Sequence, residues 1–337
     1  MAFSSRHPST DLAVPKSQKA AVFEEWGKPV KILERPVTQE SELKPGQILV
    51  KILYSGVCHT DLHTARAEWP IMPPTPLVGG HEGAGGPTCF VVAIGAGTQS
   101  AVKVGQAVGV KWIASSCLSC EACTRAMQLM LHPSQLAIKQ SNTFPGDIVV
   151  IPGAGGGLGK CGHLAIQYAI NGFGLRVIAI DTGDHKRELC LNLGAEIFID
   201  FKESNNLVED VIRAADGVGV HAAIVTSGSA EGYNRALRYL RPAGTLVAVG
   251  APPGAKLEVD IIASIPRNIT IKVSYVGNRE DARQALDMVA RGRVRTTCRV
   301  EPLAKLPEIF EEMQEGKLAG RVVLDLSGPG VSSGTRS

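Results

Sequence analysis

The order of apolar and polar positions divides the chain into two parts. From about Lys19 to Lys111, short apolar runs are broken by Gly and Pro, a pattern typical of a domain rich in strands and loops. From about Phe144 onward, strand-like runs such as DIVVIPG, LRVIAID and TLVAVG alternate with helical patterns such as LAIQYAI and KRELCLNLG. This alternation predicts an α/β fold, in which helices cover both faces of a doubly wound parallel sheet.

The residues after about Asn278 follow a third pattern. Two amphipathic helical stretches, EDARQALDMVARG and LPEIFEEMQEG, lead into the apolar run GRVVLDL, and the last residues are rich in Ser and Gly. We therefore expect a β-rich domain over 1–143 and the parallel-sheet domain over 144–278. A C-terminal segment over 279–337 should then end in a disordered tail.

Composition is that of a folded protein and excludes several partners. Of the 337 residues, 44% are apolar and 20% are charged, so a sizeable core can form. The net charge of +3 is too balanced to indicate a nucleic acid or an anionic membrane as a partner. No apolar run is long enough to cross a bilayer. Because the first residues lack the apolar core of a secretory signal, we expect a cytoplasmic protein, with a mitochondrial presequence as the alternative.

A glycine-rich loop between a predicted strand and a predicted helix is the first chemical motif. It follows the strand 148–151 and contains Gly153, Gly155, Gly156, Gly157 and Gly159. Backbone N–H groups in such a turn, together with the helix dipole, bind a pyrophosphate. The next predicted strand ends in Asp181, whose carboxylate suits the adenosine ribose hydroxyls and repels a 2′-phosphate, and Lys186 can support the same ribose. This pattern predicts NAD rather than NADP, and a tight structural turn is the alternative.

Cys58 and His81 are candidate ligands of a metal ion. They lie in the runs CHTDLH and GGHEG, and a Cys with a His suits a borderline-soft cation such as Zn²⁺. Asp61 can accept a hydrogen bond from His81 and fix its tautomer. A buried cysteine and a histidine with an ordinary partner are the alternative for each residue taken singly.

A second group of cysteines has the spacing of a structural zinc site. Three thiols at this spacing make most of a four-cysteine site: Cys117, Cys120 and Cys123. Three unrelated loop cysteines are the alternative.

Together these motifs resemble the zinc-dependent medium-chain alcohol dehydrogenases, in particular their fungal ethanol-dehydrogenase branch. The resemblance covers about residues 19–326 and rests on YSGVCHTDLH, PLVGGHEGAG, GAGGGLG, FIDF, SYVGNR and GRVV. It implies a GroES-like catalytic domain with a zinc lobe near 112–132, an NAD-binding Rossmann domain, and a C-terminal return into the catalytic domain. It also implies a homodimer or homotetramer.

The resemblance assigns catalytic roles as well. Cys58 and His81 would bind a catalytic zinc, and Glu82 would lie beside it and could coordinate it. Thr60 and His63 would relay a proton between substrate and solvent, which suits the acid–base chemistry of histidine.

The resemblance also implies the residues that contact cofactor and substrate. Trp69 and Trp112 would line the substrate pocket, and two large rings there would favour small primary alcohols and aldehydes. For the apolar residues implied at the cofactor, ordinary packing in the Rossmann core is the alternative. The cofactor contacts implied are His59 and Arg321 at the pyrophosphate, and Leu158, Phe201, Val249, Ala251, Ser274 and Val276 at the adenosine and nicotinamide.

The chain departs from the family pattern after Cys123, where the segment before the glycine loop is much shorter. The family supplies there a fourth structural cysteine and a third, cysteine ligand of the catalytic zinc. His132 is a candidate for the missing structural ligand, and Cys89 or Cys161, which fall in small insertions, for the catalytic one. Because the irregularities are abrupt, mis-assigned exon boundaries are a further hypothesis, which transcript sequencing tests.

Three functions follow from these observations. The first is an NAD-dependent alcohol dehydrogenase that moves a hydride between a small primary alcohol or aldehyde and nicotinamide, in ethanol or secondary metabolism. The second is a zinc-independent reductase of the same superfamily, against which the intact CHTDLH and GGHEG runs argue. The third is a non-enzymatic NAD-binding protein, or a misassembled gene product, that lacks the third zinc ligand. Alcohol-dependent NADH formation, its loss with a chelator, and NAD binding without turnover distinguish the three.

Overall fold

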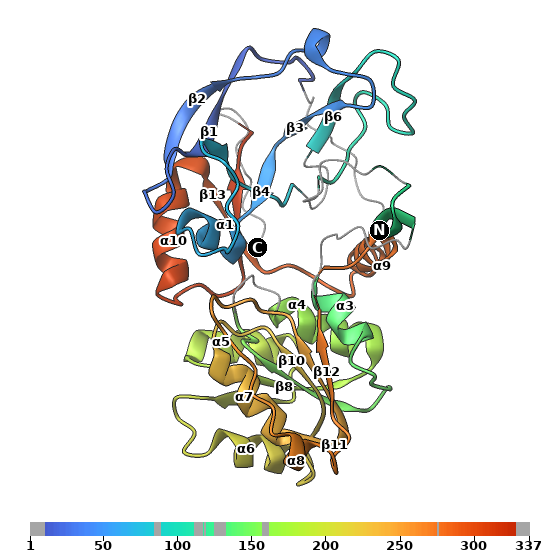
Figure 1. Ribbon diagram of the computed structural model, residues 1–337, viewed down its shortest axis with the longest axis vertical. Coiled ribbons are helices and arrows are strands. Elements are labelled where there is room, and N and C mark those ends of the chain that lie inside the picture. The colour runs from blue at the N-terminus through green and yellow to red at the C-terminus, as the bar shows by residue number, and fades with distance from the viewer. Residues whose placement is uncertain are drawn as a thin grey trace.

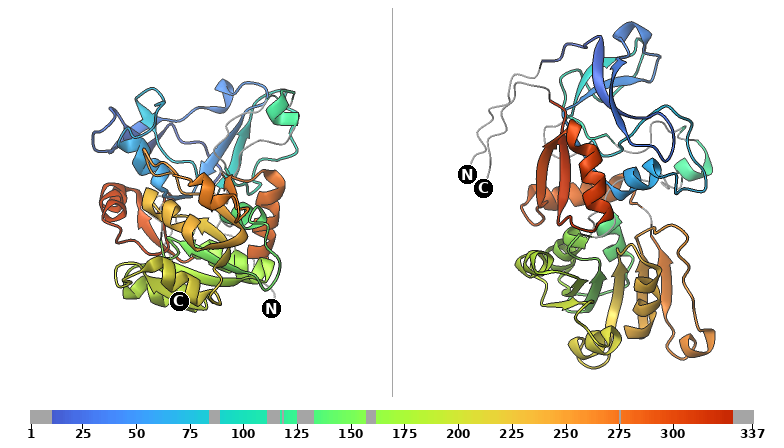
Figure 2. Two further views of the ribbon diagram at one scale, coloured as in Figure 1. Left: turned by 60° about the horizontal axis from the view of Figure 1, so that its bottom comes forward. Right: turned by 90° about the vertical axis from the view of Figure 1, so that its left-hand side faces the viewer.

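The computed structural model describes residues 11–83, 89–110, 117, 119–124, 133–156, 162–274 and 276–327. Its elements form two halves stacked along the long axis, and helices α1 (His59–Ala65) and α10 (Leu306–Gln314) lie at the side of the upper half that faces the lower one (Figures 1 and 2). Several residues singled out from the sequence lie outside the described ranges, and the predictions for them stay predictions: Trp112, His132, Gly157, Leu158, Gly159 and Cys161.

The N-terminal half is built from short strands in small sheets, as its broken apolar pattern predicts. One sheet has the order β2-β1-β5 and a second pairs β3 with β6. The strands are β1 (Ser17–Phe23), β2 (Lys31–Pro36), β3 (Ile48–Ile52), β4 (Tyr54–Gly56), β5 (Leu77–Val78) and β6 (Cys89–Ile94). The helices are η1 (Glu40–Glu42), α1 (His59–Ala65) and α2 (Glu121–Thr124). The next helix, α3 (Pro133–Lys139), already lies with the other half, since its Ala137 and Ile138 join a core of the parallel-sheet half (Figure 1).

The other half is a six-stranded parallel sheet in the order β12-β11-β10-β7-β8-β9. Its strands are β7 (Ile148–Pro152), β8 (Arg176–Asp181), β9 (Ile197–Asp200), β10 (Val220–Val225), β11 (Leu240–Ala248) and β12 (Thr270–Val273). The chain first adds strands on one side of β7 and then on the other, so the strand order reverses between β7 and β10. The carboxyl ends of the strands at such a reversal form a crevice that binds ligands in open α/β sheets.

Helices cover both faces of this sheet, which confirms the predicted doubly wound α/β fold. Alternate residues of β7 enter opposite cores: Val149 and Ile151 join one buried cluster, and Ile148 and Val150 join the other. Strands buried on both faces read as continuous apolar runs, as DIVVIPG does. The helices of this half are α4 (Gly162–Gln167), η3 (Tyr168–Gly172), α5 (Asp184–Asn192), α6 (Leu207–Ala214), α7 (Ala230–Tyr239) and α8 (Ile261–Ser264).

The C-terminal segment returns to the N-terminal half. Its elements are α9 (Arg279–Ala290), β13 (Cys298–Pro302), η4 (Leu303–Lys305), α10 (Leu306–Gln314) and β14 (Arg321–Asp325). β14 pairs with β13 and, antiparallel, with β4, where Leu324 faces Ser55. The apolar side of α10, with Ile309 and Phe310, packs into the same core as Leu62 of α1. Residues from the end of the chain are thereby placed beside the CHTDLH motif.

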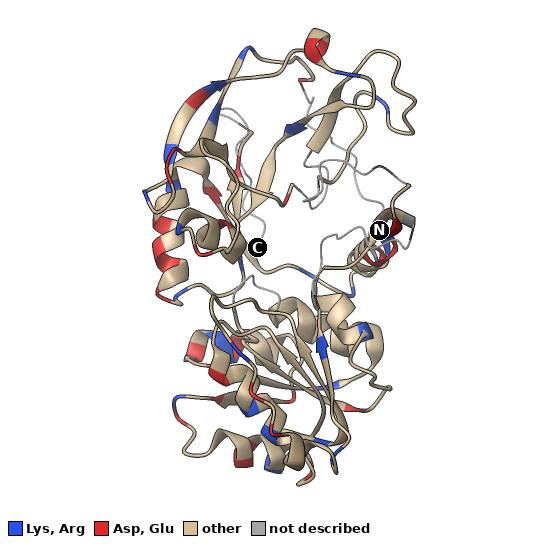
Figure 3. Ribbon diagram, viewed as in Figure 1, with Lys and Arg blue, Asp and Glu red and all other residues tan. Residues whose placement is uncertain are grey.

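Charges of both signs are interspersed over both halves of the molecule (Figure 3). This distribution agrees with the balanced composition. Among the described residues, every helix is too short or too polar to span a bilayer.

Candidate active site

Asp61 ties together the two metal-ligand candidates of the N-terminal half. Helix α1 begins directly after Cys58, and the Asp61 carboxylate accepts a hydrogen bond from the Cys58 backbone N–H at 2.9 Å. Its other oxygen lies 3.1 Å from His81 Nδ1. This contact directs Nδ1 of His81 to the carboxylate, so Nε2 is the nitrogen suited to a metal, as expected for a ligating histidine.

Cys58, His81 and Glu82 form a cluster whose ligand atoms all lie within 4.8 Å of one another. Burial raises the pKa of Cys58, but the hydrogen bond with His81, the charge of His81 and the hydrogen bond from the Thr60 backbone N–H together outweigh it, so the pKa of this thiol is lowered. Burial likewise lowers the pKa of His81, but Asp61 and Cys58 outweigh it and raise that pKa to about 10. A thiolate, an imidazole nitrogen and a carboxylate oxygen fit zinc, and a fourth position remains for water or substrate.

Glu82 is held by a partner from the far end of the chain. Arg321, the first residue of β14, forms an ion pair with the Glu82 carboxylate, and the two side chains are only 13% and 15% exposed. The neighbouring Gly320 N–H lies 3.5 Å from the carbonyl oxygen of Gly155 in the glycine-rich loop. Arg321 therefore lies between the metal-ligand cluster and the loop. Its contact with a pyrophosphate stays a prediction.

The Glu82–Arg321 pair occupies the space beside Gly56, where any other residue would have a side chain. A Cβ at this position would overlap Glu82 Oε2 and lie 2.9 Å from Arg321 Nη2. We expect Gly56→Ala to push the pair apart, to lower the free energy of unfolding by about 1–3 kcal/mol, and to weaken zinc binding about tenfold. Urea unfolding and chelator competition measure both effects. Ser55→Ala is the control on the same strand, and zinc affinity and stability that stay unchanged in Gly56→Ala would contradict the expectation.

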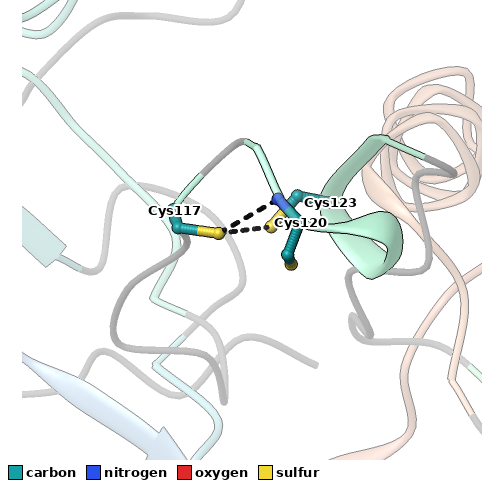
Figure 4. Close-up of side chains that lie close together, drawn as sticks. All are labelled: Cys117, Cys120 and Cys123. Atoms are coloured by element: carbon teal, nitrogen blue, oxygen red, sulfur yellow. Dashed lines mark hydrogen bonds between the residues drawn. The ribbon is translucent and has the colours of Figure 1, made fainter.

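The three cysteines of the second group come together as their spacing predicts (Figure 4). Their Sγ atoms lie within 4.8 Å of one another, and those of Cys117 and Cys123 are 3.8 Å apart. Hydrogen bonds from the backbone N–H groups of Ser119 and Cys120 lower the pKa of Cys117 to about 6. A thiolate is the form that binds a metal. Within the described ranges, the cluster comprises these three cysteines, and three thiolates fit most of a zinc site.

A cavity of about 640 Å³ lies where α1 faces the carboxyl ends of the parallel strands. His59 and His63 line it from α1, while Gly153 and Asp181 line it from the sheet. Its volume is that of a typical ligand pocket, and its position is the expected binding crevice of a doubly wound sheet.

The glycine-rich loop is fixed beside Asp181 at the end of β8. Asp181 Oδ2 accepts a hydrogen bond from the Gly155 N–H at 3.0 Å, and its Oδ1 accepts one from Lys186 Nζ at 2.9 Å. Gly153 has a φ of +84°, which favours glycine. A Cβ on Gly155 would lie 2.5 Å from the Cβ of Lys186, so the loop packs too closely there for a side chain. Gly156 follows in the same loop.

Of the two residues predicted to relay a proton, one lies beside the metal-ligand cluster and the other lines the cavity. Thr60 Oγ1 is 3.6 Å from Cys58 Sγ, and His63 lines the cavity. Trp69 contacts His63 edge to face, with the ring centroids 5.5 Å apart, and donates a hydrogen bond to Thr64. Trp69 is not among the residues that line this cavity, so its role in substrate binding stays a prediction.

Some of the remaining predicted residues line the cavity and others do not. Phe201 and Lys186 line the cavity. Cys89 is buried in β6 and is not part of the group formed with Cys58. Four other residues predicted to contact the cofactor do not line the cavity, and those contacts stay predictions: Val249, Ala251, Ser274 and Val276. Of these, Val249 packs against the core of the sheet.

Glu68 is a cavity residue that the sequence analysis did not single out. One of its carboxylate oxygens lies 2.5 Å from His63 Nδ1, and the other lies 3.0 Å from Arg66 Nε. The sequence carries a signal for it, since an acidic residue shortly after a histidine at the end of a short helix can turn back toward that histidine.

Comparison with known proteins agrees with this architecture. Residues 44–157 match the model of the alcohol dehydrogenase GroES-like domain, and residues 161–291 match that of the zinc-binding dehydrogenases. An alcohol dehydrogenase of Schizosaccharomyces pombe is 41% identical over 364 residues, covering 94% of this chain and 100% of the relative. Alcohol dehydrogenase 1 of Emericella nidulans is 40% identical over 360 residues, covering 94% and 99%. The 364-residue alignment is longer than the 337-residue chain, so it contains gaps in this chain.

Solved structures share the fold. The alcohol dehydrogenase of Aeropyrum pernix has a TM-score of 0.79 and 24% identity, covering 91% of this chain and 99% of that one. The acetophenone reductase of Geotrichum candidum, solved with NAD, has a TM-score of 0.75 and 22% identity, covering 94% and 99%.

Fold, ligand clusters and family matches define a zinc-type medium-chain dehydrogenase. Within this class the chain belongs to the alcohol dehydrogenase family and is of the fungal type. The expectations of an oxidoreductase that uses zinc and NAD are therefore confirmed at the level of the family. The zinc-independent reductase and the non-enzymatic protein are not favoured.

Proposed function

We propose that the protein is an NAD-dependent alcohol dehydrogenase that interconverts a small primary alcohol and its aldehyde. The observation that carries the proposal is a single cavity that joins His63 to the nucleotide-binding features at Asp181 and Gly153. Cys58, a ligand of the proposed zinc, directly precedes His59 on the wall of that cavity. Metal, acid–base group and nucleotide would thus meet at one place.

Glu82 is proposed as the third protein ligand of the catalytic zinc, in place of the cysteine that the chain lacks. Support comes from its oxygen, which lies within 4.8 Å of the donor atoms of Cys58 and His81. Three protein ligands and one open position are the usual arrangement of a catalytic zinc. Bound zinc would supply a Lewis acid for the substrate oxygen, and bound NAD would supply the hydride acceptor.

The chain's own residues would handle the proton. Oxidation of an alcohol sends a hydride to the cofactor and a proton to solvent. Thr60 lies beside the metal-ligand cluster, and His63 lines the cavity, so the two could pass that proton outward. His63 would accept the proton at Nε2, because its Nδ1 already faces Glu68.

Preference for NAD over NADP is supported by the position of Asp181. Its side chain is 7% exposed, lies at the carboxyl end of β8 and lines the cavity. A carboxylate there accepts hydrogen bonds from ribose hydroxyls and repels a 2′-phosphate. His59, on the opposite wall, is proposed to face the pyrophosphate.

We further propose that two copies associate through the edge of the parallel sheet. Strand β12 ends the strand order, and in the described part of the chain it pairs with β11 alone. Val273 on this strand is 87% exposed, and Ile262 and Ile265 on the adjacent α8 segment are 85% and 72% exposed. Exposed apolar side chains at a sheet edge favour association with another chain. Light scattering of the purified protein measures the assembly.

A cytoplasmic location is proposed because the described cysteines are in the thiol form. None of the described cysteines forms a disulfide, which is typical of a reducing compartment.

The test of the proposed function uses the purified full chain, with zinc content measured in parallel. Alcohol-dependent NADH formation that a chelator removes and added zinc restores would support the dehydrogenase. Turnover that persists without zinc would favour the zinc-independent reductase. Binding of NAD without turnover, in a protein that holds no catalytic zinc, would favour a protein that has lost its chemistry.

A further inference from the structure

The chain turns back on itself directly after helix α1. The turn passes through Ala67, whose φ of +58° is in the left-handed region that residues other than glycine rarely adopt. The backbone N–H of Glu68 then donates to the carbonyl oxygen of His63 at 3.0 Å. Sterically disfavoured backbone is concentrated at functional sites. This turn brings the Glu68 side chain back to the helix that carries the relay.

Both oxygens of the Glu68 carboxylate are engaged. Oε2 lies 2.5 Å from His63 Nδ1, and Oε1 lies 3.0 Å from Arg66 Nε. The His63 side chain is 10% exposed, whereas that of Glu68 is 25% exposed. The carboxylate is therefore oriented from both sides, and it lines the cavity together with His63 and Arg66.

An imidazole that contacts a carboxylate through Nδ1 has its other nitrogen directed elsewhere. A carboxylate accepts but does not donate, so the contact requires a proton on Nδ1. In this tautomer Nε2 carries the lone pair and can accept a proton from the cavity. A carboxylate in this position orients a histidine and stabilises the imidazolium, as the aspartate does in the Ser-His-Asp arrangement.

We propose that Glu68 is the positioning residue of the proton relay: its carboxylate holds His63 in the Nδ1–H tautomer and stabilises the imidazolium that forms when Nε2 takes up the proton of the alcohol. The imidazolium then releases a proton from Nε2 to water in the cavity, which restores neutral His63 in the same Nδ1–H tautomer. One proton enters and one leaves, while the hydride of the same alcohol goes to NAD. This inference rests on the proposed alcohol dehydrogenase activity.

The first test observes His63 directly, by NMR of the imidazole nitrogens in the ¹⁵N-labelled full chain, with His63→Gln to assign the signals. The wild type should show the Nδ1–H tautomer and a downfield Nδ1–H proton, since the contact is short and charge-assisted. Glu68→Ala should lose the downfield proton and populate the Nε2–H tautomer. Glu68→Gln keeps an acceptor oxygen without the charge, so it should keep the tautomer and move the proton signal upfield.

Glu231→Gln is the matched control. Glu231 is another carboxylate on the wall of this cavity, and it pairs with Arg235 rather than with a histidine. Its replacement changes the charge of the cavity equally but should leave the His63 signals in place. His63 signals that are the same in Glu68→Ala as in the wild type would overturn the proposal, whether or not the enzyme turns over.

The second test separates positioning from a merely structural role through kinetics. Loss of the carboxylate should lower kcat for alcohol oxidation about a hundredfold in Glu68→Ala and about tenfold in Glu68→Gln, with KM for NAD unchanged. Glu68→Asp retains the charge and should recover most of kcat. Equal losses in the Asp and Gln variants, or an effect on KM alone, would contradict the proposed role. A wild type without alcohol-dependent turnover would refute the proposed function instead, and the NMR result would still decide the Glu68–His63 contact.

Discussion

Replacement of Cys58 by alanine is expected to lower alcohol-dependent NADH formation at least about a thousandfold, equivalent to ~4 kcal/mol of transition-state stabilisation. The variant removes the thiolate from the cluster that it forms with His81 and Glu82. Two remaining protein ligands rarely retain a catalytic zinc. Zinc content should therefore fall by about one ion per chain, as measured by atomic absorption on the dialysed protein alongside the NADH assay.

The matched control for this experiment is Cys298→Ala. Cys298 is an exposed cysteine on β13 that belongs to neither group of metal-ligand candidates. Its replacement should leave zinc content and turnover unchanged. Cys120→Ala provides a second comparison, because it should lose zinc from the other cluster while the catalytic cluster keeps its ligands. A Cys58→Ala variant that retains both its zinc and its turnover would contradict the proposed ligand set.

Asp181→Asn is expected to change the preference between NAD and NADP by about a hundredfold, or ~2.7 kcal/mol. The substitution keeps the shape of the side chain and one acceptor oxygen, but it removes the charge that would repel a 2′-phosphate. We expect kcat/KM to fall about tenfold with NAD and to rise about tenfold with NADP. Steady-state kinetics with both cofactors at a fixed alcohol concentration measure the ratio.

Asp200→Asn is the matched control for cofactor preference. Asp200 ends the neighbouring strand in register with Asp181 and accepts hydrogen bonds from the backbone N–H groups of Gly183 and Lys202. Burial raises the pKa of Asp200, but these hydrogen bonds outweigh it, so the pKa is lowered. Asp200 is not among the residues that line the cavity with Asp181, so Asp200→Asn should lower stability without changing the NAD/NADP ratio. Equal ratios in Asp181→Asn and the wild type would refute the assignment of Asp181.

Cys58→Ala and Asp181→Asn test features on opposite sides of the same cavity. Cys58 precedes the helix that carries His59 and His63, whereas Asp181 ends a strand of the parallel sheet. Loss of zinc should leave dinucleotide binding measurable, and loss of the Asp181 charge should leave zinc content unchanged. Separate outcomes would therefore distinguish failure of the metal site from failure of the nucleotide site.

The parallel sheet and the local motifs could be predicted from the sequence because their physical causes are local. Continuous apolar runs such as that of β7 are buried on both faces, and the alternation of such runs with helical patterns specifies the fold class. The spacing of Cys117, Cys120 and Cys123 within one turn-rich stretch brings their sulfur atoms together with few degrees of freedom. The role of Asp181 at the ribose can likewise be predicted, because this residue directly ends a predicted strand.

Strand β13 and helix α3 were not predicted, for a different physical reason. The run CRVEP of β13 is mostly polar and exposed, and it is a strand because it pairs with β14. Pairing of this kind depends on a partner and not on intrinsic preference. Helix α3 lies in the shortened segment, where comparison with the family pattern offers no guide.

Periodicity and short spacings along the chain are therefore enough to predict the α/β class, the glycine-rich loop and the groups of Cys and His residues that suit zinc. The contacts between groups that are distant in the chain become visible in the folded molecule. β14 returns to β4 and places Arg321 against Glu82, and the turn at Ala67 brings Glu68 back to His63. Such contacts depend on strand pairing and on chain direction after a helix, which the local pattern of apolar and polar residues does not encode.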